Sequence, residues 1–300
     1  MKTISLPPEF EGHELIASVS GGKDSTAFTL ALRDAGIPCR YVFADTGWEA
    51  PQTYEYLDFL RDRLDIRIDV VGAEGGMLAR GETRAGFPRR LGKWCTIELK
   101  IEPIRAYHGR VMDETGLDVV AIVGIRAEES PKRAALPEKD LEAEGPRGFG
   151  WKTWRPIIDW TVEDVLEIHR RHDLPVNELY RRGANRVGCW PCLFASKGEI
   201  KLIADIDPGR IDLIREHEAR FSALRVERNA EKPGRYKHLD ATFFTGRKGS
   251  AVGYIADIDS VVAWSRTSRG GRQLPLIQPP PEGGCYRWGL CDPLASSEEE

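Results

Sequence analysis

The sequence predicts an α/β fold, in which a doubly wound, Rossmann-like parallel sheet is followed by a cysteine-containing extension that is mostly helical and irregular. Apolar runs at residues 15–20, 40–45 and 66–71 have the length of buried strands. Helical apolar spacing fills residues 25–35 and 51–64 between these runs. Strands that alternate with helices in this way form βαβ units and a parallel sheet.

Further elements follow in the same pattern. An apolar run at residues 119–123 predicts a fourth strand, and residues 154–158 predict an edge strand. Residues 72–93 are rich in Gly and Arg and predict a mobile loop. The character of the chain changes at Gly188, after which residues 197–206 and 208–226 predict helices. We therefore expect a boundary between residues 1–187 and 188–300.

Composition limits the classes of function. The net charge of −4 over 300 residues argues against a uniformly basic nucleic-acid surface and leaves room for a local basic cleft. There is no run of about 18 apolar residues, so no membrane span is expected. The first ten residues do not resemble a signal peptide, which predicts a cytoplasmic location. Thiols stay reduced there, so the six cysteines suggest metal binding or redox chemistry more than disulfides.

The most informative segment is Ser20-Gly21-Gly22-Lys23-Asp24-Ser25, which joins the first strand to the first helix. The two glycines allow a tight turn and a close approach to a ligand. The helix N-terminus offers N–H groups and partial positive charge, to which Lys23 adds a full charge. Together these groups predict an anion site suited to pyrophosphate. The alternative is a strand–helix turn that happens to contain two glycines.

The second strand ends at Asp45-Thr46-Gly47, at the edge of the sheet where open parallel sheets bind ligands. Asp45 is therefore a candidate contact for a ribose or a metal ion. An aspartate that caps its own loop is the alternative reading.

Ordered motifs along residues 15–195 resemble the PAPS reductase and N-type ATP pyrophosphatase superfamily, which has the adenine nucleotide alpha hydrolase-like fold. The 20–25 loop resembles the SGGKDS pyrophosphate loop of that superfamily. Short motifs are unreliable singly, but the shared order and spacing argue against coincidence. The other matching segments are Phe43–Gly47 with Pro51, Trp94–Thr96, Leu99-Lys100 with Pro103, Gly124–Arg126 with Glu129-Ser130, Pro156–Thr161, Leu179-Tyr180 and Gly188–Cys192.

Within that superfamily the chain most resembles the ATPase subunits of DNA phosphorothioation and phage-encoded PAPS reductase-like proteins. These combine an intact loop with an iron–sulfur cysteine set. Sulfonucleotide reductases usually lack the Gly-Gly-Lys, carry adjacent cysteines where this chain has only Cys95, and have a catalytic Glu-Cys-Gly-x-His segment that is absent here. The resemblance implies an ATP pyrophosphatase that adenylates an acceptor and supports iron–sulfur-linked sulfur transfer.

The resemblance also implies ligands and residue roles. The nucleotide would be ATP with Mg²⁺, and the implied catalytic residues are Lys23, Asp24, Asp45 and Cys291. Expected partners are a nucleic-acid acceptor, a sulfur donor such as a cysteine desulfurase, and further copies of the chain in a homo-oligomer. The implied nucleotide-binding residues are Ser20, Gly21, Gly22, Lys23, Asp24, Ser25, Asp45, Thr46, Gly124, Arg126 and Ser130.

The spacing of the cysteines suggests a candidate iron–sulfur site. Cys189 and Cys192 form a CxxC pair, and Cys95, Cys285 and Cys291 compete for the remaining places of a four-thiolate cluster such as 4Fe–4S. We expect Cys95, Cys189 and Cys192 as ligands with Cys285 or Cys291 as the fourth. The leftover cysteine would carry sulfur as a persulfide. A four-cysteine zinc site and a redox-active CxxC are the alternatives.

Arginine clusters near these motifs suggest an anionic second substrate, either nucleic acid or a phosphorylated nucleotide. They lie at residues 80–93, 181–186 and 266–272, and solvated loops are the alternative reading. Two other functions remain open. One is a phosphoadenosine or adenosine phosphosulfate reductase that uses a C-terminal thiol. The other is a non-catalytic nucleic-acid-binding accessory subunit.

Overall fold

The computed structural model describes residues 2–90, 92–141, 152–244 and 256–268. Its strands form a six-stranded sheet in the order β3-β2-β1-β4-β6-β5, parallel except for β5, which is antiparallel to β6. The chain therefore winds outward in both directions from the β1–β4 pair, which confirms the predicted fold. The strands are β1 Glu14–Ser18, β2 Arg40–Asp45, β3 Ile68–Gly72, β4 Val119–Val123, β5 Lys139–Asp140 and β6 Lys152–Trp154.

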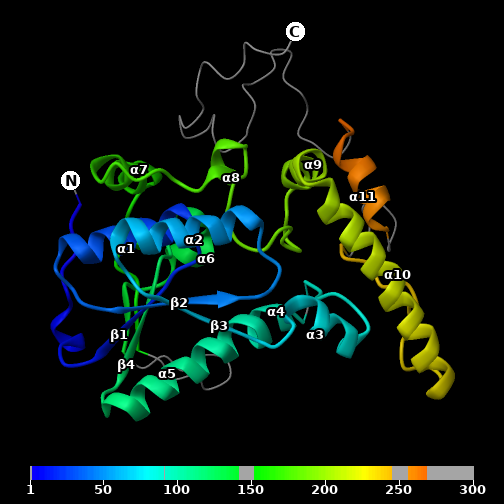
Figure 1. Cartoon of the computed structure of the whole chain (residues 1–300), viewed down its shortest axis with the longest axis horizontal. Coiled ribbons are helices and arrows are strands. Elements are labelled where there is room, and N and C mark those ends of the chain that lie inside the picture. Colours follow the sequence, from blue (N-terminus) through cyan, green and yellow to red (C-terminus); the bar gives the residue numbers. More distant parts are fainter. Residues whose placement is uncertain (1, 91, 142–151, 245–255, 269–300) are drawn as a thin grey trace, which may run out of the picture.

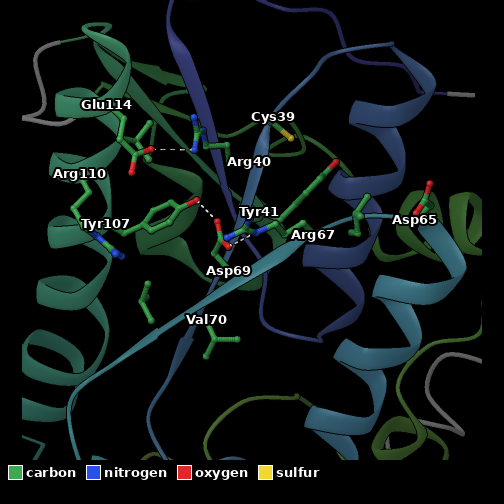
Figure 2. Close-up of a pocket in the computed structure, with 13 residues that line it drawn as sticks. Cys39, Arg40, Tyr41, Asp65, Arg67, Asp69, Val70, Tyr107, Arg110 and Glu114 are labelled. Atoms are coloured by element: carbon green, nitrogen blue, oxygen red, sulfur yellow. Dashed lines mark hydrogen bonds and ion pairs between the residues drawn. The ribbon is translucent and has the colours of Figure 1, made fainter.

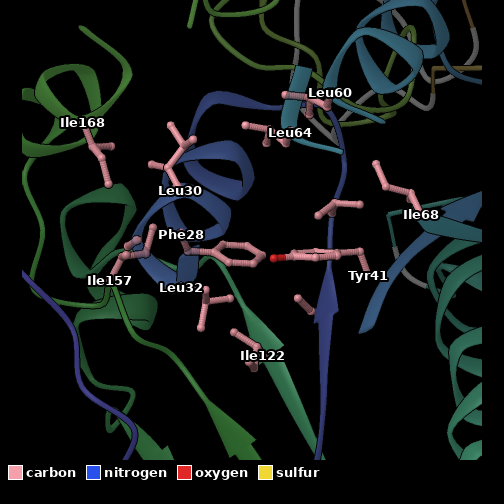
Figure 3. Packing of buried hydrophobic residues seen from close by; sticks show 14 of the residues in the cluster. Phe28, Leu30, Leu32, Tyr41, Leu60, Leu64, Ile68, Ile122, Ile157 and Ile168 are labelled. Atoms are coloured by element: carbon pink, nitrogen blue, oxygen red, sulfur yellow. The ribbon is translucent and has the colours of Figure 1, made fainter. Parts of the chain in front are cut away.

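Helices cover both faces of the sheet (Figure 1). One face packs against α1 (Lys23–Asp34), α2 (Pro51–Leu64) and α7 (Val162–Arg171) through a large apolar core. Figure 3 shows Phe28 and Leu32 of α1 close to Ile122 of β4 in this core. The other face packs against α5 (Glu102–Thr115).

The region expected to be a mobile loop, residues 72–93, contains a helix, α3 (Gly76–Arg84). The prediction was wrong because glycines were read as loop formers, whereas Gly81 is a packing position. A Cβ added at Gly81 would lie 2.4 Å from Cζ of Phe221. The glycine thus lets two helices approach closely, which local sequence does not reveal. A short helix α4 (Trp94–Thr96) and a π-helical turn, η2 (Ile97–Ile101), lead from there into α5.

The strand predicted at residues 154–158 is β6, which begins and ends earlier and is not at the edge of the sheet. The edge is instead β5, a two-residue strand that pairs antiparallel with β6. Between β4 and β5 the chain forms a 3-10 turn, η3 (Ala127–Glu129), and a short helix, α6 (Pro131–Ala134).

The helices predicted at 197–206 and 208–226 are α9 (Lys197–Ile206) and α10 (Pro208–Glu231). The structure adds two helices that were not predicted, α8 (Glu178–Arg181) and α11 (Ile258–Ser265). A second core joins these helices to the chain after β2. In it the Phe87 ring lies 4.9 Å from that of Phe221, and Trp48 stacks on Phe243 at 5.7 Å between ring centroids. This core therefore contains residues from both sides of the boundary expected at 187/188. Within the described ranges, no helix combines the length and apolar character needed to cross a membrane.

Candidate functional site

The candidate site lies where the chain leaves β1 and β4, at the carboxyl ends of these adjacent strands. From here the chain continues in opposite directions along the sheet, from β1 to β2 and from β4 to β6, and such a switch point opens a crevice for ligands. A cavity of about 460 Å³ lies at this point. Its lining residues are Ser18, Ser20, Gly22, Lys23, Asp24, Ser25, Gly124, Glu129, Arg133, Tyr180, Asn185, Arg186 and Val187.

The loop is held in shape by its own serines. Gly21 has a φ of +69°, a conformation that glycine adopts without strain. Ser25 Oγ accepts from the Ser20 N–H at 3.2 Å and donates to the Gly22 carbonyl at 2.9 Å. Gly22 is the N-cap residue of α1 and has no side chain to cover the helix N-terminus. No side-chain cap covers the N–H groups of Asp24 and Ser25 in the first turn, and both residues line the cavity, as in other anion-binding helix termini.

Side chains from α7 and α8 support the loop from behind. His169 is buried, and its ring nitrogens lie 2.9 Å from the Lys23 carbonyl oxygen and 3.0 Å from that of Leu174. Burial lowers the pKa of His169 in spite of these two contacts. Tyr180 Oη accepts from the Lys23 N–H at 3.3 Å, and the Asn177 amide donates to the Gly21 carbonyl at 3.4 Å. The loop is thus fixed before any ligand arrives.

Charged groups cluster behind and around the loop. Lys23 Nζ lies 2.6 Å from one oxygen of Asp24, and Arg126 Nε donates to the other at 2.5 Å. Burial alone would lower the pKa of Arg126, but Asp24 and Glu128 outweigh it, so the pKa is raised and the guanidinium stays charged. The ionisable lining groups are Lys23, Arg133 and Arg186 against Asp24 and Glu129, an excess of one positive charge.

Part of the predicted nucleotide set lies outside this lining. Asp45 Oδ1 accepts from the Gly47 N–H and from Tyr54 Oη, both at 2.8 Å, which is the loop-capping arrangement that was the alternative reading. Thr46 is buried and donates to Glu49 at 2.8 Å. Gly21, Arg126 and Ser130 do not line the cavity either. Ser130 instead caps α6, where its Oγ accepts from the Arg133 N–H at 3.3 Å.

Several lining residues had no role assigned from sequence. Two matching segments contain Tyr180 and Glu129, and the segment with Glu129 extends to Arg133-Ala134. Arg186 belongs to the arginine cluster at residues 181–186. Their positions in the sequence were therefore a signal, but nothing local showed that α6 and the segment after α8 face the first loop. Ser18, Asn185 and Val187 carried no signal in the sequence.

The CxxC segment pairs with the chain that follows β2. Glu49 and Cys189 form an isolated antiparallel bridge, the Trp190 N–H donates to the Trp48 carbonyl at 2.8 Å, and Trp48 Nε1 donates to the Pro191 carbonyl at 3.0 Å. This pairing brings residues separated by about 140 positions into register. It places the CxxC near the carboxyl end of β2, the strand next to β1 in the sheet.

Three predicted ligands lie near one another but do not form a metal site. Cys95 interacts electrostatically with Cys189 and Cys192, and burial raises the pKa of Cys95 and of Cys189. No group of three or more His, Cys, Asp or Glu side chains in the described ranges is arranged to hold a metal ion. Cys285 and Cys291, the candidates for the fourth ligand and for the catalytic thiol, lie outside the described residues.

Lys100 is a site residue that sequence reasoning missed. Its ammonium group interacts electrostatically with Cys189 and lies 4.0 Å from Glu49 Oε1. Burial alone would lower the pKa of Lys100, but Cys189 and Glu49 outweigh it and raise the pKa. Lys100 therefore supplies a positive charge beside the thiol. Its signal was its place in the matching segment Leu99-Lys100, to which no role was assigned.

A larger cavity, of about 740 Å³, lies between β2, β3 and α5 (Figure 2). It opens at the amino ends of the strands, away from the edge where parallel sheets bind ligands. Its charges are matched: Arg40, Arg67 and Arg110 stand against Asp65, Asp69 and Glu114. Asp69 already accepts hydrogen bonds from Tyr107 Oη at 2.6 Å and from Arg67 Nε at 2.7 Å. We therefore take the smaller, positively charged cavity as the candidate site.

A glycine-rich loop that begins a helix at the switch point of a doubly wound sheet defines a nucleotide-binding α/β domain. Residues 14–195, more than half of the chain, match the family model described as the phosphoadenosine phosphosulfate reductase domain. The chain belongs to this family.

Curated proteins and solved structures are similar to this chain to different extents. An uncharacterized 37.8 kDa protein of Escherichia phage 186 is 30% identical, over 87% of this chain and 91% of the relative. The adenosine 5'-phosphosulfate reductase of Allochromatium vinosum is 28% identical, over 65% of this chain and 73% of that enzyme. Among solved structures, the phosphoadenylyl-sulfate reductase of Candida auris, a phosphate complex, is similar with a TM-score of 0.44 and 19% identity, over 59% of this chain and 81% of the other.

Proposed function

We propose that the chain is an ATP pyrophosphatase that adenylates an acceptor and supports transfer of sulfur to it. The observation that carries the proposal is the cavity at the N-terminus of α1, where Lys23, Arg133 and Arg186 surround a preformed Gly-Gly turn. A cavity with this excess of positive charge, beside a helix N-terminus, suits a polyphosphate.

The residues present suit release of pyrophosphate. An acceptor oxygen attacks the α-phosphorus of ATP, the bond from that phosphorus to the α–β bridging oxygen breaks, and pyrophosphate leaves with the electron pair. Negative charge develops on the leaving group, and Lys23 Nζ together with the N–H groups of α1 stabilises it. Lys23 is only 5% exposed, so water screens its charge little. Arg126 holds Asp24 in place behind Lys23 and thereby positions the ammonium group.

Magnesium would enter with the nucleotide as part of the substrate. Mg²⁺ in phosphate-transfer sites is held by one or two carboxylates and by the phosphates themselves. Both oxygens of Asp24 already face a cation, Lys23 or Arg126, and this would repel a metal ion. Asp24 in this arrangement does not suit metal ligation, and Asp45 is engaged by Tyr54 and Gly47.

The thiols near the site suit the sulfur step. Cys95, Cys189 and Cys192 would supply three of the four thiolates that a 4Fe–4S cluster takes, with Cys285 or Cys291 proposed as the fourth. When bound, the cluster would supply iron sites that hold sulfur. The charge of Lys100 beside Cys189 opposes the rise in the Cys189 pKa that burial causes. Sulfur itself would come from a donor such as a cysteine desulfurase.

Substitution of Lys23 by Ala tests ATP cleavage. We expect pyrophosphate release from ATP to fall at least about 100-fold, which is typical for loss of a group that stabilises the leaving charge. Lys132→Ala is the matched control, because Lys132 is exposed and does not line the cavity. Pyrophosphate release that is unchanged in the Lys23 variant would overturn the proposal.

A second candidate is a sulfonucleotide reductase, favoured by the 28% identity to an adenosine 5'-phosphosulfate reductase over 65% of the chain. The two candidates differ in substrate and product. The wild-type protein should be offered ATP, adenosine phosphosulfate and phosphoadenosine phosphosulfate, with thioredoxin as the reductant. Pyrophosphate from ATP supports the first proposal, whereas thioredoxin-dependent sulfite from either sulfonucleotide supports the second. A non-catalytic accessory subunit would yield neither product.

A further inference from the structure

An exposed aromatic ring with two cations on it lies just beyond the CxxC. Phe194 is 45% exposed, which is unusual for a ring of its size. Arg90 Cζ and Lys93 Nζ each lie 5.4 Å from the centre of the Phe194 ring. Both cations come from the segment between α3 and α4, so two distant parts of the chain build this surface.

The positive charge of this surface is not compensated. Among the described residues, no carboxylate forms an ion pair with Arg90 or Lys93. Most exposed arginines elsewhere do pair, as Arg215 does with Asp259 at 2.7 Å and Arg220 with Glu82 at 3.1 Å. Arg89, which precedes Arg90 in the chain, is exposed. The pKa of Arg225 is lowered mainly by burial and, to a smaller extent, by the positive charge of Arg89. Although the chain has a net charge of −4, its described residues thus leave Arg90 and Lys93 without an ion pair.

A second aromatic–cation pair lies close by in the sequence. Lys197 Nζ lies 5.1 Å from the centre of the Trp264 ring, and Lys197 begins α9 three residues after Phe194. Phe194 in turn follows Cys192 by two residues, in the segment whose earlier part, Arg186, lines the nucleotide cavity. The same segment of the chain thus contributes Arg186 to the nucleotide cavity and Phe194 to this surface.

We propose that Phe194, Arg90 and Lys93 bind single-stranded nucleic acid, with a base on the ring and the adjoining phosphates on the cations. A protein partner with an apolar patch would suit a bare aromatic ring but would bury two unpaired charges at a cost. A single strand offers both a flat π face and anionic phosphates at short spacing, and this combination is what stacking platforms bind. The idea that the bound nucleic acid is the acceptor rests on the proposed ATP reaction. The proposal that nucleic acid binds to this surface does not.

Binding of a fluorescent 12-residue oligothymidine to the full-length protein, followed by anisotropy, tests the proposal. Phe194→Leu keeps apolar bulk but removes the π face, and we expect it to weaken binding by about 5- to 100-fold. Phe194→Tyr keeps the ring and should bind as the wild type does. The double variant Arg90→Gln/Lys93→Gln should reduce the slope of log affinity against log salt by about 1.4, since each phosphate contact to a single strand contributes about 0.7.

The matched control is Arg67→Gln/Arg110→Gln, which also removes two positive charges but from the cavity at the amino ends of the strands. It should leave binding unchanged. Equal loss in both double variants would mean unspecific attraction and would overturn the proposal, as would full binding by Phe194→Leu. Tighter binding of a fluorescent polyglutamate peptide than of the oligonucleotide would assign the surface to an acidic protein instead. Pyrophosphate release from ATP by the same variants, measured without nucleic acid, keeps a failure here separate from a failure of the nucleotide site.

Discussion

Gly124, the first residue after β4, shows how one hydrogen atom in place of a methyl group shapes the site. A Cβ at this position would lie 2.6 Å from Cδ1 of Phe28 and 3.2 Å from the Asp24 carbonyl oxygen. Phe28 is fully buried in the core under α1 and cannot move aside freely. The glycine thus lets the end of β4 lie against the first turn of α1.

We expect Gly124→Ala to lower the free energy of unfolding by about 1–3 kcal/mol through overpacking. It should also weaken nucleotide binding, because the first turn of α1 must shift. Urea denaturation and titration with ATP would measure the two effects. The control is Gly109→Ala in α5, where a Cβ meets nothing within 4 Å and removal of a helical glycine should stabilise by about 1 kcal/mol. A Gly124 variant as stable as the wild type would contradict the packing argument.

The cysteines differ in what surrounds them, and this sets which ones should bind the cofactor. Cys189 has Lys100, Cys95 and Cys192 as neighbours, whereas Cys39 lies against Tyr41 and burial raises its pKa to about 11. We expect anaerobically prepared protein to contain iron and acid-labile sulfide, with both lost in Cys189→Ala and retained in Cys39→Ala. Chemical assay of iron, sulfide and zinc would measure this. Stoichiometric zinc without sulfide would favour the structural zinc alternative.

At the scale of elements, α5 carries a buried titratable group. His108 is 2% exposed on the helix that covers one face of the sheet, and burial lowers its pKa from 6.5 to about 4. The unfolded chain therefore binds a proton at higher pH than the folded chain does. The stability linked to His108 is complete above pH 6.5 and is lost as the pH falls from 6.5 toward 4, by up to about 1.4 kcal/mol per pH unit.

Leucine cannot bind a proton, so we expect acidification to destabilise the His108→Leu variant less than it destabilises the wild type. The difference in free energy of unfolding between the two should shift by about 2 kcal/mol in favour of the variant from pH 7.5 to pH 5.0. Urea denaturation at the two pH values measures this shift. His238→Leu is the control, because it removes an exposed imidazole instead of the buried one. A constant difference for His108→Leu would contradict the buried-histidine argument.

Elements with strong local signals could be predicted from the sequence. The helix at residues 25–35 and the strands at 40–45 and 119–123 were found because apolar periodicity and flanking glycines agree there. The helix α9 was found with its bounds, since Ser196 and Glu199 form a capping box. The helix α3 was missed because its glycines serve contacts with other elements, Gly81 against Phe221 and Gly76 against Thr46. Such contacts have no local pattern.

The same division holds for the site. The Ser20–Ser25 loop could be located because its chemistry is contiguous in sequence. The cavity wall could not, since Tyr180, Arg186 and Arg133 reach the loop only through the packing of distant segments. Lys100 was missed for the same reason: its partners Cys189 and Glu49 are joined by a tertiary bridge between chain segments 140 residues apart. Asp45 was predicted to contact the nucleotide, yet in the structure its carboxylate accepts hydrogen bonds from Gly47 and Tyr54.

At the scale of the molecule, the two parts of the chain share a core. Trp48 and Phe87 come from before the boundary predicted at 187/188, and Phe221 and Phe243 come from after it. Their rings are in mutual contact, with Phe87 4.9 Å from both Phe221 and Phe243. The CxxC segment is anchored on the same unit through Trp48. The boundary therefore remains a proposal about function, whereas the packing predicts that both parts unfold together.

Phe221→Ala tests that coupling. Removal of a fully buried ring should lower the free energy of unfolding by about 3–5 kcal/mol. Because the core is shared, urea transitions followed by tryptophan fluorescence and by far-ultraviolet circular dichroism should coincide in the wild type and shift together in the variant. Val226→Ala is the control on the same helix, since Val226 is 54% exposed and its loss should change stability by no more than about 0.5 kcal/mol. Two separated transitions in the wild type, with only one displaced in Phe221→Ala, would show instead that the nucleotide-binding part folds independently of the helices that carry the CxxC.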